Sequence, residues 1–447
     1  MPSAPRPQRY VIVGAGIAGL SAASSIRSAD PQAQLTLVGD ERHPPYSRPG
    51  LAYFLANEIP QGQLFPWSSA ELRGLKVAFV SGRAVRLDTA GRNLTLSDGR
   101  TVVYDALLLA TGAPAVLPDI PGAQLRGVVT LDRLDDAAHI LSLAKRARRA
   151  VVIGGGITAV EIAEGLAARG VETHYFMRKD RFWSQVLDPE ESCLVERGMV
   201  RHGIRLHHNT NVVRVLGKRE RVKGVLTDNG DSIQCEIVGF AIGIRPRMEL
   251  AAGAGLSVDR GILTDEFLRT SAAGVFAAGD VAQVFDPATG KHTLDSLWWM
   301  AEDQGRAAGV NMVGGASPYL RGIPLNVTRI GGLIVTIVGH VGQGGDDADL
   351  VSIVHGDSET WRESLDSFAV HSREHDSRIR LLVGEEFLVG AVILGDQTLS
   401  RPLTELVRNR VPLGRLRQQL MRAPETAVKI LVDYGQKQVL QSMQALA

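Results

Sequence analysis

Three glycines at a fixed spacing, Gly14, Gly16 and Gly19, could bind a pyrophosphate near the start of the chain. In this pattern the first glycine makes a turn, the second lets the backbone approach the phosphates, and the third lets a helix pack closely on its strand. The helix N-terminus offers free N–H groups and the positive end of its dipole. Asp40, after the next predicted strand, is placed to accept hydrogen bonds from a ribose. These residues predict a dinucleotide site.

A second copy of this motif has Gly154, Gly156 and, in place of the third glycine, Ala159. Each copy follows a short β-branched run that is typical of a buried parallel strand. Each precedes apolar residues at helical intervals, and another predicted strand comes next. Because the copies lie far apart in the sequence, they indicate two separate dinucleotide-binding units and not a solenoid.

The second unit has no acid at the expected ribose position. Met177 follows its second strand, and Arg178 and Lys179 come next. An acid here would repel the 2′-phosphate of NADPH, whereas a cation would attract it. The sequence therefore favours NADPH slightly over NADH, but two basic residues are also typical of a solvent-exposed loop. The choice between the two nucleotides stays open.

Three more junctions follow predicted strands. Gly279 and Asp280 end a small-residue strand, which lets the backbone approach a ligand and puts a carboxylate where α/β folds bind ligands. Ala-Thr-Gly at 110–112 follows the apolar strand 106–109, and Ala-Ile-Gly-Ile-Arg-Pro at 241–246 follows another strand. We interpret both as turns from a strand into a crossover.

In this order, the five motifs resemble those of the two-dinucleotide-binding-domain flavoproteins, the pyridine nucleotide–disulfide oxidoreductase superfamily, over about residues 9–400. The resemblance implies an α/β fold with two Rossmann-like, glutathione-reductase-like domains and an α+β C-terminal interface domain. It also implies tight, non-covalent FAD in the first unit and NAD(P)H in the second. The expected FAD domain is 1–117 with 241–324, the NAD(P)H domain is 118–240, and the dimer-interface domain with a helical tail is 325–447.

Residues 45–53 narrow the resemblance to a subgroup, because they contain no redox-active cysteine. They are similar to the segment found in ferredoxin, rubredoxin and nitrite reductases and in apoptosis-inducing-factor relatives, as are residues 296–312. In that subgroup the residues matching Asp40 and Arg48 bind the adenosine side of FAD, and Trp298 matches a residue against the flavin ring. An ordinary core tryptophan is the alternative for Trp298.

One position departs from that subgroup. Its members often pair a lysine with a glutamate on the helix of the second unit; Glu161 matches the glutamate, but Tyr53 stands at the lysine position. An unpaired carboxylate beside a flavin is costly, so we expect the pKa of Glu161 to rise, or its side chain to bind the substrate amide.

The predicted site residues combine these arguments. The predicted catalytic residues are Glu161, Tyr53 and Trp298. The predicted cofactor-binding residues are Gly14, Gly16, Ile17, Ala18, Gly19, Asp40, Glu41, Arg48, Val85, Ala110, Thr111, Gly112, Gly154, Gly156, Ile157, Thr158, Glu161, Arg178, Gly243, Gly279, Asp280 and Trp298.

These features lead to the hypothesis of an FAD-dependent NAD(P)H oxidoreductase, in which nicotinamide passes hydride to flavin N5 and electrons then reach an external acceptor. The acceptor would be a ferredoxin- or rubredoxin-type protein or a partner subunit, because neither Cys193 nor Cys235 resembles a reactive thiol. Two alternatives stay open: an oxidase that reacts directly with O₂, and a redox-sensing flavoprotein that acts through a partner.

Composition excludes several other classes. The net charge of +1 lacks the basic field of a nucleic-acid-binding protein. No apolar run reaches the roughly 18 residues that span a bilayer, and the first nine residues lack a signal-peptide core. The two cysteines form no CxxC pair, which favours the cytoplasm. No metal site is predicted, and a homodimer is expected from the resemblance.

Local patterns also predict connecting elements. Turn residues at 97–99 and 228–230 indicate hairpins. The run 378–394 indicates a further hairpin that turns at 384–386. Helices are expected at about 403–408 and from Leu416 onward, and the tail 423–447 has an amphipathic pattern.

Overall fold

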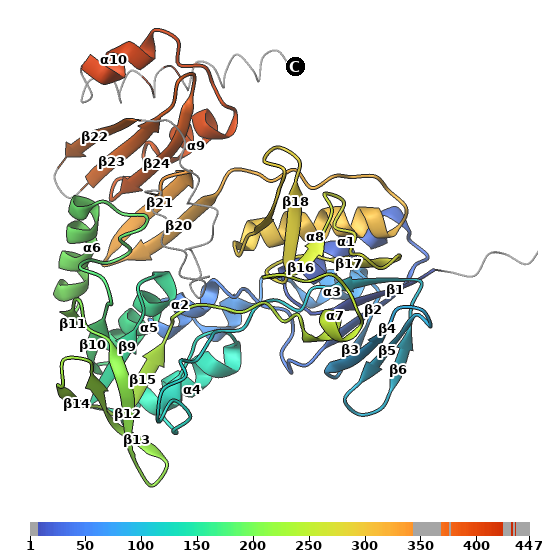
Figure 1. The fold of residues 1–447 in the computed structure, drawn as a ribbon, viewed down its shortest axis with the longest axis horizontal. Helices are drawn as coiled ribbons and strands as arrows, with labels where there is room; N and C mark the ends of the chain where they lie inside the picture. Colours follow the sequence, from blue (N-terminus) through green and yellow to red (C-terminus); the bar gives the residue numbers. More distant parts are fainter. Residues whose placement is uncertain (1–7, 343–367, 375–376, 423–430, 432–433, 435–447) are drawn as a thin grey trace, which may run out of the picture. The chain divides into compact units, whose positions relative to one another are not determined.

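The computed structural model describes residues 8–342, 368–374 and 377–422, together with residues 431 and 434. The chain divides into two compact units. Figure 1 labels their helices and strands and colours the chain by residue number. The first comprises Met1–Phe54, Glu58–Ala115 and Ile244–Arg321, and the second comprises Leu55–Asn57, Val116–Gly243 and Gly322–Ala447. The finer three-domain division stays a prediction, and most of the tail 423–447 lies outside the described residues.

The first unit is built on a five-stranded sheet in the order β17-β7-β1-β2-β3. Its helices and strands are β1 (Arg9–Val13), α1 (Ile17–Ala29), β2 (Gln34–Gly39), α2 (Gly50–Leu55), the 3₁₀ helix η1 (Gln61–Leu64), α3 (Ser69–Gly74), β3 (Val77–Ser81), β4 (Ala84–Asp88), β5 (Asn93–Leu96), β6 (Thr101–Val103), β7 (Ala106–Leu109), α7 (Glu249–Gly253), β16 (Ile262–Thr264), β17 (Val275–Ala277), β18 (Ala282–Asp286), β19 (Lys291–Leu294) and α8 (Trp298–Met312). All neighbouring strands of the five-stranded sheet pair in parallel.

Three of the predicted motifs meet at one edge of this sheet. The Gly14 motif follows β1, the Ala-Thr-Gly motif at 110–112 follows the fully buried β7, and Gly279 with Asp280 follows β17. Because β1, β7 and β17 are adjacent and parallel, their carboxyl ends lie together. The sheet order extends from β1 toward β2 on one side and toward β7 on the other, which is the arrangement where α/β folds bind ligands.

The second unit contains another five-stranded parallel sheet, in the order β11-β10-β9-β15-β8. Its elements are β8 (Val128–Val129), α4 (Leu134–Ala144), β9 (Arg149–Ile153), α5 (Ile157–Ala168), β10 (Glu172–Phe176), α6 (Pro189–Arg201), β11 (Ile204–His207), β12 (Val212–Lys218), β13 (Arg221–Thr227), β14 (Ser232–Gln234) and β15 (Ile237–Phe240). The Gly154 motif follows β9, Met177 follows β10, and the first residues of the 241–246 motif, 241–243, follow β15, so they too share one sheet edge.

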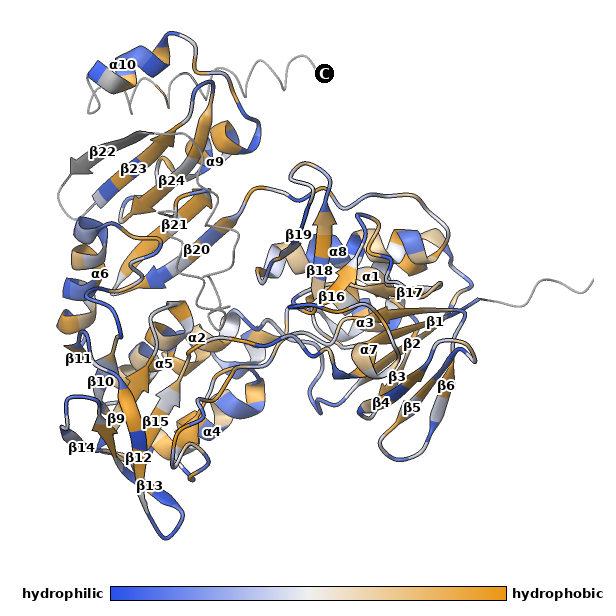
Figure 2. Cartoon of the chain, viewed as in Figure 1, coloured by the Kyte–Doolittle hydropathy of each residue, from blue (hydrophilic) through white to orange (hydrophobic). Residues whose placement is uncertain are grey.

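The C-terminal part of the second unit is an antiparallel sheet in the order β20-β21-β24-β23-β22. Its elements are β20 (Leu325–Ile330), β21 (Leu333–Gly339), β22 (Phe368–Glu374), β23 (Ser377–Val383), β24 (Leu388–Leu394), α9 (Ser400–Arg408) and α10 (Leu416–Arg422). The central strand β24 is buried at every position and hydrophobic along its length (Figure 2). Helix α9 covers one face of the sheet with Leu403, Leu406 and Val407.

The predicted connecting elements agree with the structure. Hairpins form between β5 and β6 and between β13 and β14, at the predicted turns. Strands β23 and β24 form the hairpin that turns at 384–386. Helix α9 begins three residues before the predicted start at Leu403, and α10 begins at Leu416. The mixed α/β fold with two parallel sheets is confirmed.

Candidate dinucleotide-binding sites

The protein's own packing explains only two of the three glycines in the first motif. Gly14 has φ +119°, and a Cβ there would lie 2.1 Å from the carbonyl oxygen of Ala110. A Cβ at Gly19 would lie 2.0 Å from the carbonyl oxygen of Gly14. In contrast, a Cβ at Gly16 would meet nothing within 4 Å. Packing therefore requires the first and third glycines, whereas the open space at Gly16 fits a close approach of a pyrophosphate.

Helix α1 begins at this open space without a side-chain cap. Its N-cap is Gly16, and no acidic residue lies in its first turn. Helix α6 shows the alternative, because Asp188 and Glu191 form a complete capping box at its N-terminus. Uncapped N–H groups and an uncompensated positive helix end suit a bound anion, so α1 fits the phosphates of FAD.

The neighbouring junctions are held by contacts within the first unit. Thr111 accepts a hydrogen bond from Arg247 Nη1 at 2.9 Å, and its hydroxyl donates to the Arg247 carbonyl at 3.2 Å. The N–H of Gly279 donates to Gln304 Oε1 at 2.8 Å. Both junctions also need glycine, since Gly112 has φ +68° and Gly279 has φ +79°. The structure thus brings residues 110–112 and 279 to the edge beside Gly14.

Helix α8 packs on α1 through two glycines that lie in the segment matched by the resemblance but were not among the predicted site residues. A Cβ at Gly305 would lie 2.1 Å from the Ala18 carbonyl oxygen, and one at Gly309 would lie 2.5 Å from that of Ala22. This close approach fixes α8, whose first residue is the half-buried Trp298. The sequence signal that could have predicted this packing is the small residue at every fourth position of α8.

The residues predicted to bind the adenosine side of FAD lie beside a compact cluster of polar side chains. Glu41 Oε1 lies 2.6 Å from Arg48 Nη2, and Glu41 Oε2 accepts a hydrogen bond from the Tyr46 hydroxyl at 2.6 Å. Asp40, directly after β2, is exposed to solvent. The structure therefore brings Arg48 to Glu41, and the assignment of Asp40 to a ribose stays a prediction.

Two other predicted residues lie at the surface of the first unit. Val85 is 52% exposed on β4, and Tyr53 is 36% exposed on α2. Their roles stay predictions. Sequence reasoning missed a buried pair beside α8: Arg321 makes two hydrogen bonds to Asp295, at 2.9 and 3.0 Å, and Asp295 is 1% exposed. Next to it, the buried hydroxyl of Ser296 has no partner among the described residues, which leaves it available to a ligand.

The second glycine motif shares with the first a leading glycine that packing requires. A Cβ at Gly154 would lie 2.3 Å from the Ala241 carbonyl oxygen and 2.7 Å from the Ala159 Cβ. A Cβ at Gly155 would meet nothing within 4 Å. Helix α5 starts after Gly156 with no side-chain cap and no acid in its first turn. These residues fit the pyrophosphate of a second dinucleotide, with the N–H groups of Ile157 and Thr158 at the helix start.

Glu161, on the same helix, has a carboxyl group with a raised pKa. Burial, with a smaller contribution from the Glu164 carboxyl, raises the pKa of Glu161 to about 7. Glu164 itself accepts a hydrogen bond from the Gly331 N–H at 2.7 Å. Glu161 stays partly exposed, so it can exchange a proton with solvent. A carboxyl with this pKa can hold or release a proton near neutral pH, and its catalytic role stays a prediction.

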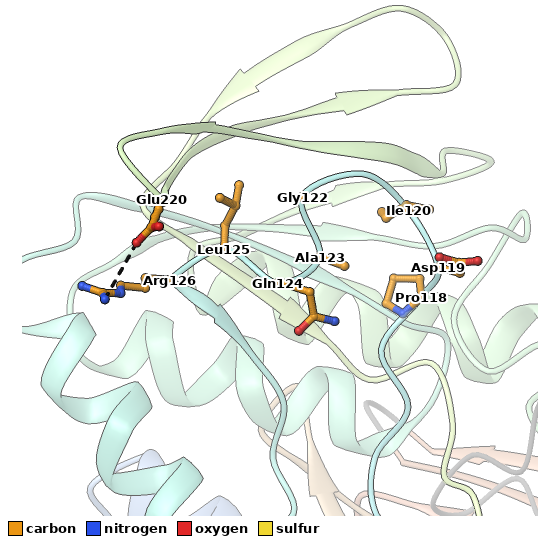
Figure 3. Close-up of a pocket in the computed structure, with 9 residues that line it drawn as sticks. All are labelled: Pro118, Asp119, Ile120, Gly122, Ala123, Gln124, Leu125, Arg126 and Glu220. Carbon is orange, nitrogen blue, oxygen red and sulfur yellow. Dashed lines mark ion pairs between the residues drawn. The ribbon is translucent and has the colours of Figure 1, made fainter.

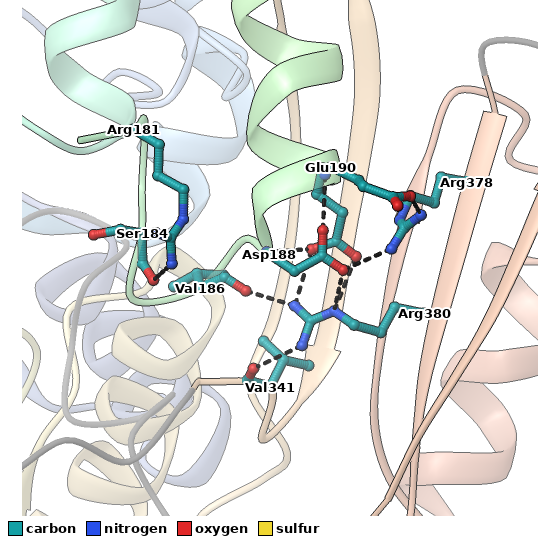
Figure 4. A network of polar contacts seen from close by, with 9 residues as sticks. Arg181, Ser184, Val186, Asp188, Glu190, Val341, Arg378 and Arg380 are labelled. Carbon is teal, nitrogen blue, oxygen red and sulfur yellow. Dashed lines mark hydrogen bonds and ion pairs between the residues drawn. The ribbon is translucent and has the colours of Figure 1, made fainter. Parts of the chain in front are cut away.

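The segment after β10 carries the residues that replace the ribose acid. Met177 is 1% exposed, whereas Arg178 and Lys179 are exposed. The end of this segment is held by the C-terminal sheet (Figure 4): Arg380 Nη2 donates to the Val186 carbonyl at 2.6 Å. Arg380 also makes two hydrogen bonds to Glu191, at 2.9 and 3.0 Å. The segment is thus supported by residues remote in the sequence.

A separate surface pocket does not coincide with either motif (Figure 3). It has a volume of about 470 Å³ and is lined by residues 118–120 and 122–126 and by Glu220. An ion pair between Arg126 and Glu220, at 3.8 Å, is largely exposed on both sides. Because this pocket is open to solvent and its ion pair is exposed, we assign no ligand to it.

The described residues also bear on metal binding and membrane insertion. No group of three or more histidine, cysteine, aspartate or glutamate side chains in that part of the chain could hold a metal ion. No helix there is long and apolar enough to cross a membrane.

Comparison with known proteins identifies the family. A model of the pyridine nucleotide-disulphide oxidoreductases matches residues 8–305. The chain therefore belongs to this family, whose members depend on FAD and NAD(P)H, and it is an oxidoreductase of that kind.

Two relatives and one solved structure show which members of the family this chain is similar to. Rhodocoxin reductase of Rhodococcus erythropolis is 32% identical over 77% of this chain and 82% of its own length. The NADH-dependent phenylglyoxylate dehydrogenase subunit epsilon of Aromatoleum evansii is 29% identical over 93% of this chain and 95% of its own length. Among solved structures, a ferredoxin reductase from Rhodopseudomonas palustris has a TM-score of 0.80 and 27% identity, covering 91% of this chain and 95% of that one.

Proposed function

We propose that this protein takes hydride from NAD(P)H and delivers electrons to an external acceptor, either a ferredoxin- or rubredoxin-type protein or a partner subunit. FAD in the first unit would convert the two-electron donation into single-electron steps. The residues of the first unit bind and orient that group, while those of the second unit bind the nucleotide.

The placement of the cysteines carries the proposal. The chain has two cysteines, and both Cys193 and Cys235 belong to the second unit. Cys235 is 1% exposed, and its burial raises the pKa of the thiol to about 12, which keeps it protonated and unreactive. The FAD unit therefore has no thiol that could pass electrons to a disulfide, and an external acceptor is the simplest alternative.

The relatives support both kinds of acceptor. Rhodocoxin reductase and the R. palustris ferredoxin reductase are named for reducing a separate electron carrier. The phenylglyoxylate dehydrogenase relative is named as one subunit of a larger enzyme. The homodimer and the cytoplasmic location stay predictions.

Anaerobic stopped-flow mixing of the FAD-bound protein with NADPH or NADH tests this function. We expect at least one nucleotide to bleach the flavin absorbance, and an added oxidised ferredoxin or rubredoxin to restore it. If neither nucleotide bleaches the flavin, the proposed function is wrong. If air restores the absorbance as rapidly as the carrier protein does, the protein is an oxidase instead.

We further propose that NADPH is favoured, because the exposed Arg178 takes the place beside a missing ribose acid. Arg178→Glu is then expected to lower the NADPH/NADH ratio of kcat/KM by about tenfold or more, the usual effect of losing a hydrogen bond between charged groups. Steady-state kinetics with both nucleotides measures the ratio. Lys218→Glu makes the same charge change at an exposed hairpin and is expected to leave the ratio unchanged. An unchanged ratio in Arg178→Glu would remove the argument for NADPH.

A further inference from the structure

The segment between β10 and α6, residues 177–188, is fixed to its surroundings at its first residues. The Met177 N–H donates to the His207 carbonyl at 2.9 Å, and the Thr210 N–H donates to the Met177 carbonyl at 3.0 Å. The Asn209 N–H donates to the Lys179 carbonyl at 3.1 Å. These bonds prolong the pairing of β10 and β11 past the end of both strands, so the exposed side chains of Arg178 and Lys179 start from an ordered backbone.

A second attachment lies three residues further along, at Phe182. Its N–H donates to Glu196 Oε1 at 2.7 Å, and its carbonyl accepts a hydrogen bond from Ser192 Oγ at 2.7 Å. The Phe182 ring is fully buried and meets the Tyr175 ring edge to face, with centroids 6.4 Å apart. Helix α6 therefore holds both backbone polar groups of Phe182, while the core of the unit holds its side chain.

Glu196 joins this attachment to the end of β11. Its second carboxylate oxygen, Oε2, lies 3.0 Å from His208 Nε2. The Glu196 side chain is 17% exposed and the His208 side chain 34%. One mostly buried carboxylate thus bridges the segment that carries Arg178 to the residues that follow β11.

We propose that Glu196, assisted by Ser192, is a positioning residue for recognition of the nucleotide 2′-phosphate. It holds residue 182 and thereby fixes the short stretch that presents Arg178 and Lys179. This inference rests on the proposed function, namely that the second unit binds NAD(P)H. A cation on a fixed backbone is already ordered before the phosphate arrives, whereas a cation on a loose loop must lose freedom on binding.

The charge of Glu196 makes the proposal sharply testable. Electrostatics alone predicts that removing a negative charge from the unit that binds the phosphate strengthens that binding. The positioning role predicts the opposite sign, because Glu196→Ala releases the Phe182 N–H and loosens the segment. The direction of the change therefore separates the two effects.

The test is isothermal titration calorimetry of the full-length, FAD-bound protein with 2′,5′-ADP and with 5′-AMP. For Glu196→Ala we expect the Kd of 2′,5′-ADP to rise about tenfold, as for a lost hydrogen bond to a charged group, while the Kd of 5′-AMP changes much less. Glu196→Gln keeps an oxygen that can accept from Phe182 and should restore the wild-type ratio. Glu220→Ala makes the same substitution at an exposed hairpin position and should leave both values unchanged.

Ser192→Ala guards against a folding defect, because it removes the bond to the Phe182 carbonyl and keeps the Glu196 charge. We expect a shift in the same direction but smaller. Wild-type discrimination in both Glu196→Ala and Ser192→Ala would overturn the positioning role. If the wild-type protein bound 5′-AMP and 2′,5′-ADP equally, phosphate recognition by this segment would be wrong, although the oxidoreductase function would stand. If it bound neither probe, the nucleotide site of the proposed function would fail.

Discussion

Replacing Gly14 by valine is expected to give a protein that no longer retains FAD. A side chain there would meet the Ala110 carbonyl, whose carbon and oxygen would lie 2.7 and 2.1 Å from the new Cβ. It would also have to adopt φ +119°, which L side chains rarely adopt. Because the turn and the cofactor's pyrophosphate share this edge, the change should displace both the backbone and the bound group. The flavin-to-protein ratio of the purified variant measures the loss.

Gly16→Val separates loss of the cofactor from loss of the fold. A Cβ at Gly16 meets no protein atom within 4 Å, so the variant should keep the secondary structure of the parent while its flavin content falls. Gly74→Val, at the exposed end of α3 with the same open surroundings, serves as the control and should retain FAD. Stoichiometric FAD in purified Gly14→Val and Gly16→Val would show that the cofactor lies elsewhere.

The second large effect is expected at Arg380, whose replacement by methionine should destabilise the second unit by about 3–5 kcal/mol, the usual consequence of breaking a buried ion pair. Arg380 holds the fully buried carboxylate of Glu191 through two hydrogen bonds and also donates to the carbonyls of Val186 and Val341. Without it, Glu191 would be a buried charge without its cation. Urea unfolding, followed by circular dichroism, measures the change.

The pH dependence of this defect has a definite sign. Burial raises the pKa of Glu191 above its ordinary value of 4.5, while Arg380 opposes that rise. Removing Arg380 should raise the folded-state pKa further, so the carboxyl is tolerated when protonated and costly when ionised. The stability deficit of Arg380→Met should therefore be small near pH 4.5 and grow as the pH increases through the new folded-state pKa.

Two companion variants test the origin of the deficit. The double variant Arg380→Met with Glu191→Met replaces both buried charges by apolar groups and should recover much of the lost stability. Arg408→Met removes one partner of an exposed pair with Glu405 and should cost less than about 1 kcal/mol. A loss in Arg380→Met no larger than in Arg408→Met would contradict the structural role of Arg380.

Short-range features of both glycine motifs were predictable from the sequence. A glycine that turns a strand into a helix, and a helix that starts without its own cap, depend on residues close together in the chain. The hairpins at 97–99, 228–230 and 384–386 were predictable for the same reason, because turn conformation is set by a few adjacent residues. The order of the motifs along the chain also sufficed to indicate the family.

The polar contacts around the sites were harder to predict from the sequence. Asp40 has the type and spacing expected of a ribose acid and lies exposed after β2, whereas no local pattern indicated the contact between Arg48 and Glu41. The pKa of Glu161 could be given a direction, but its value near 7 depends on how densely the folded chain surrounds its carboxyl. Such details depend on side-chain packing, which no local pattern encodes.

The sequence by itself determined the strand, turn and helix at each glycine motif, because backbone sterics and helix starts act over a few residues. Only the tertiary structure decided which remote residues support those motifs. Gly305 of α8 lies against Ala18 of α1, and Arg380 of β23 lies against Glu191 of α6. These contacts join residues far apart in the chain, and the free energy that selects them comes from burial and from pairing of charges removed from water. Both exist only when the core has formed.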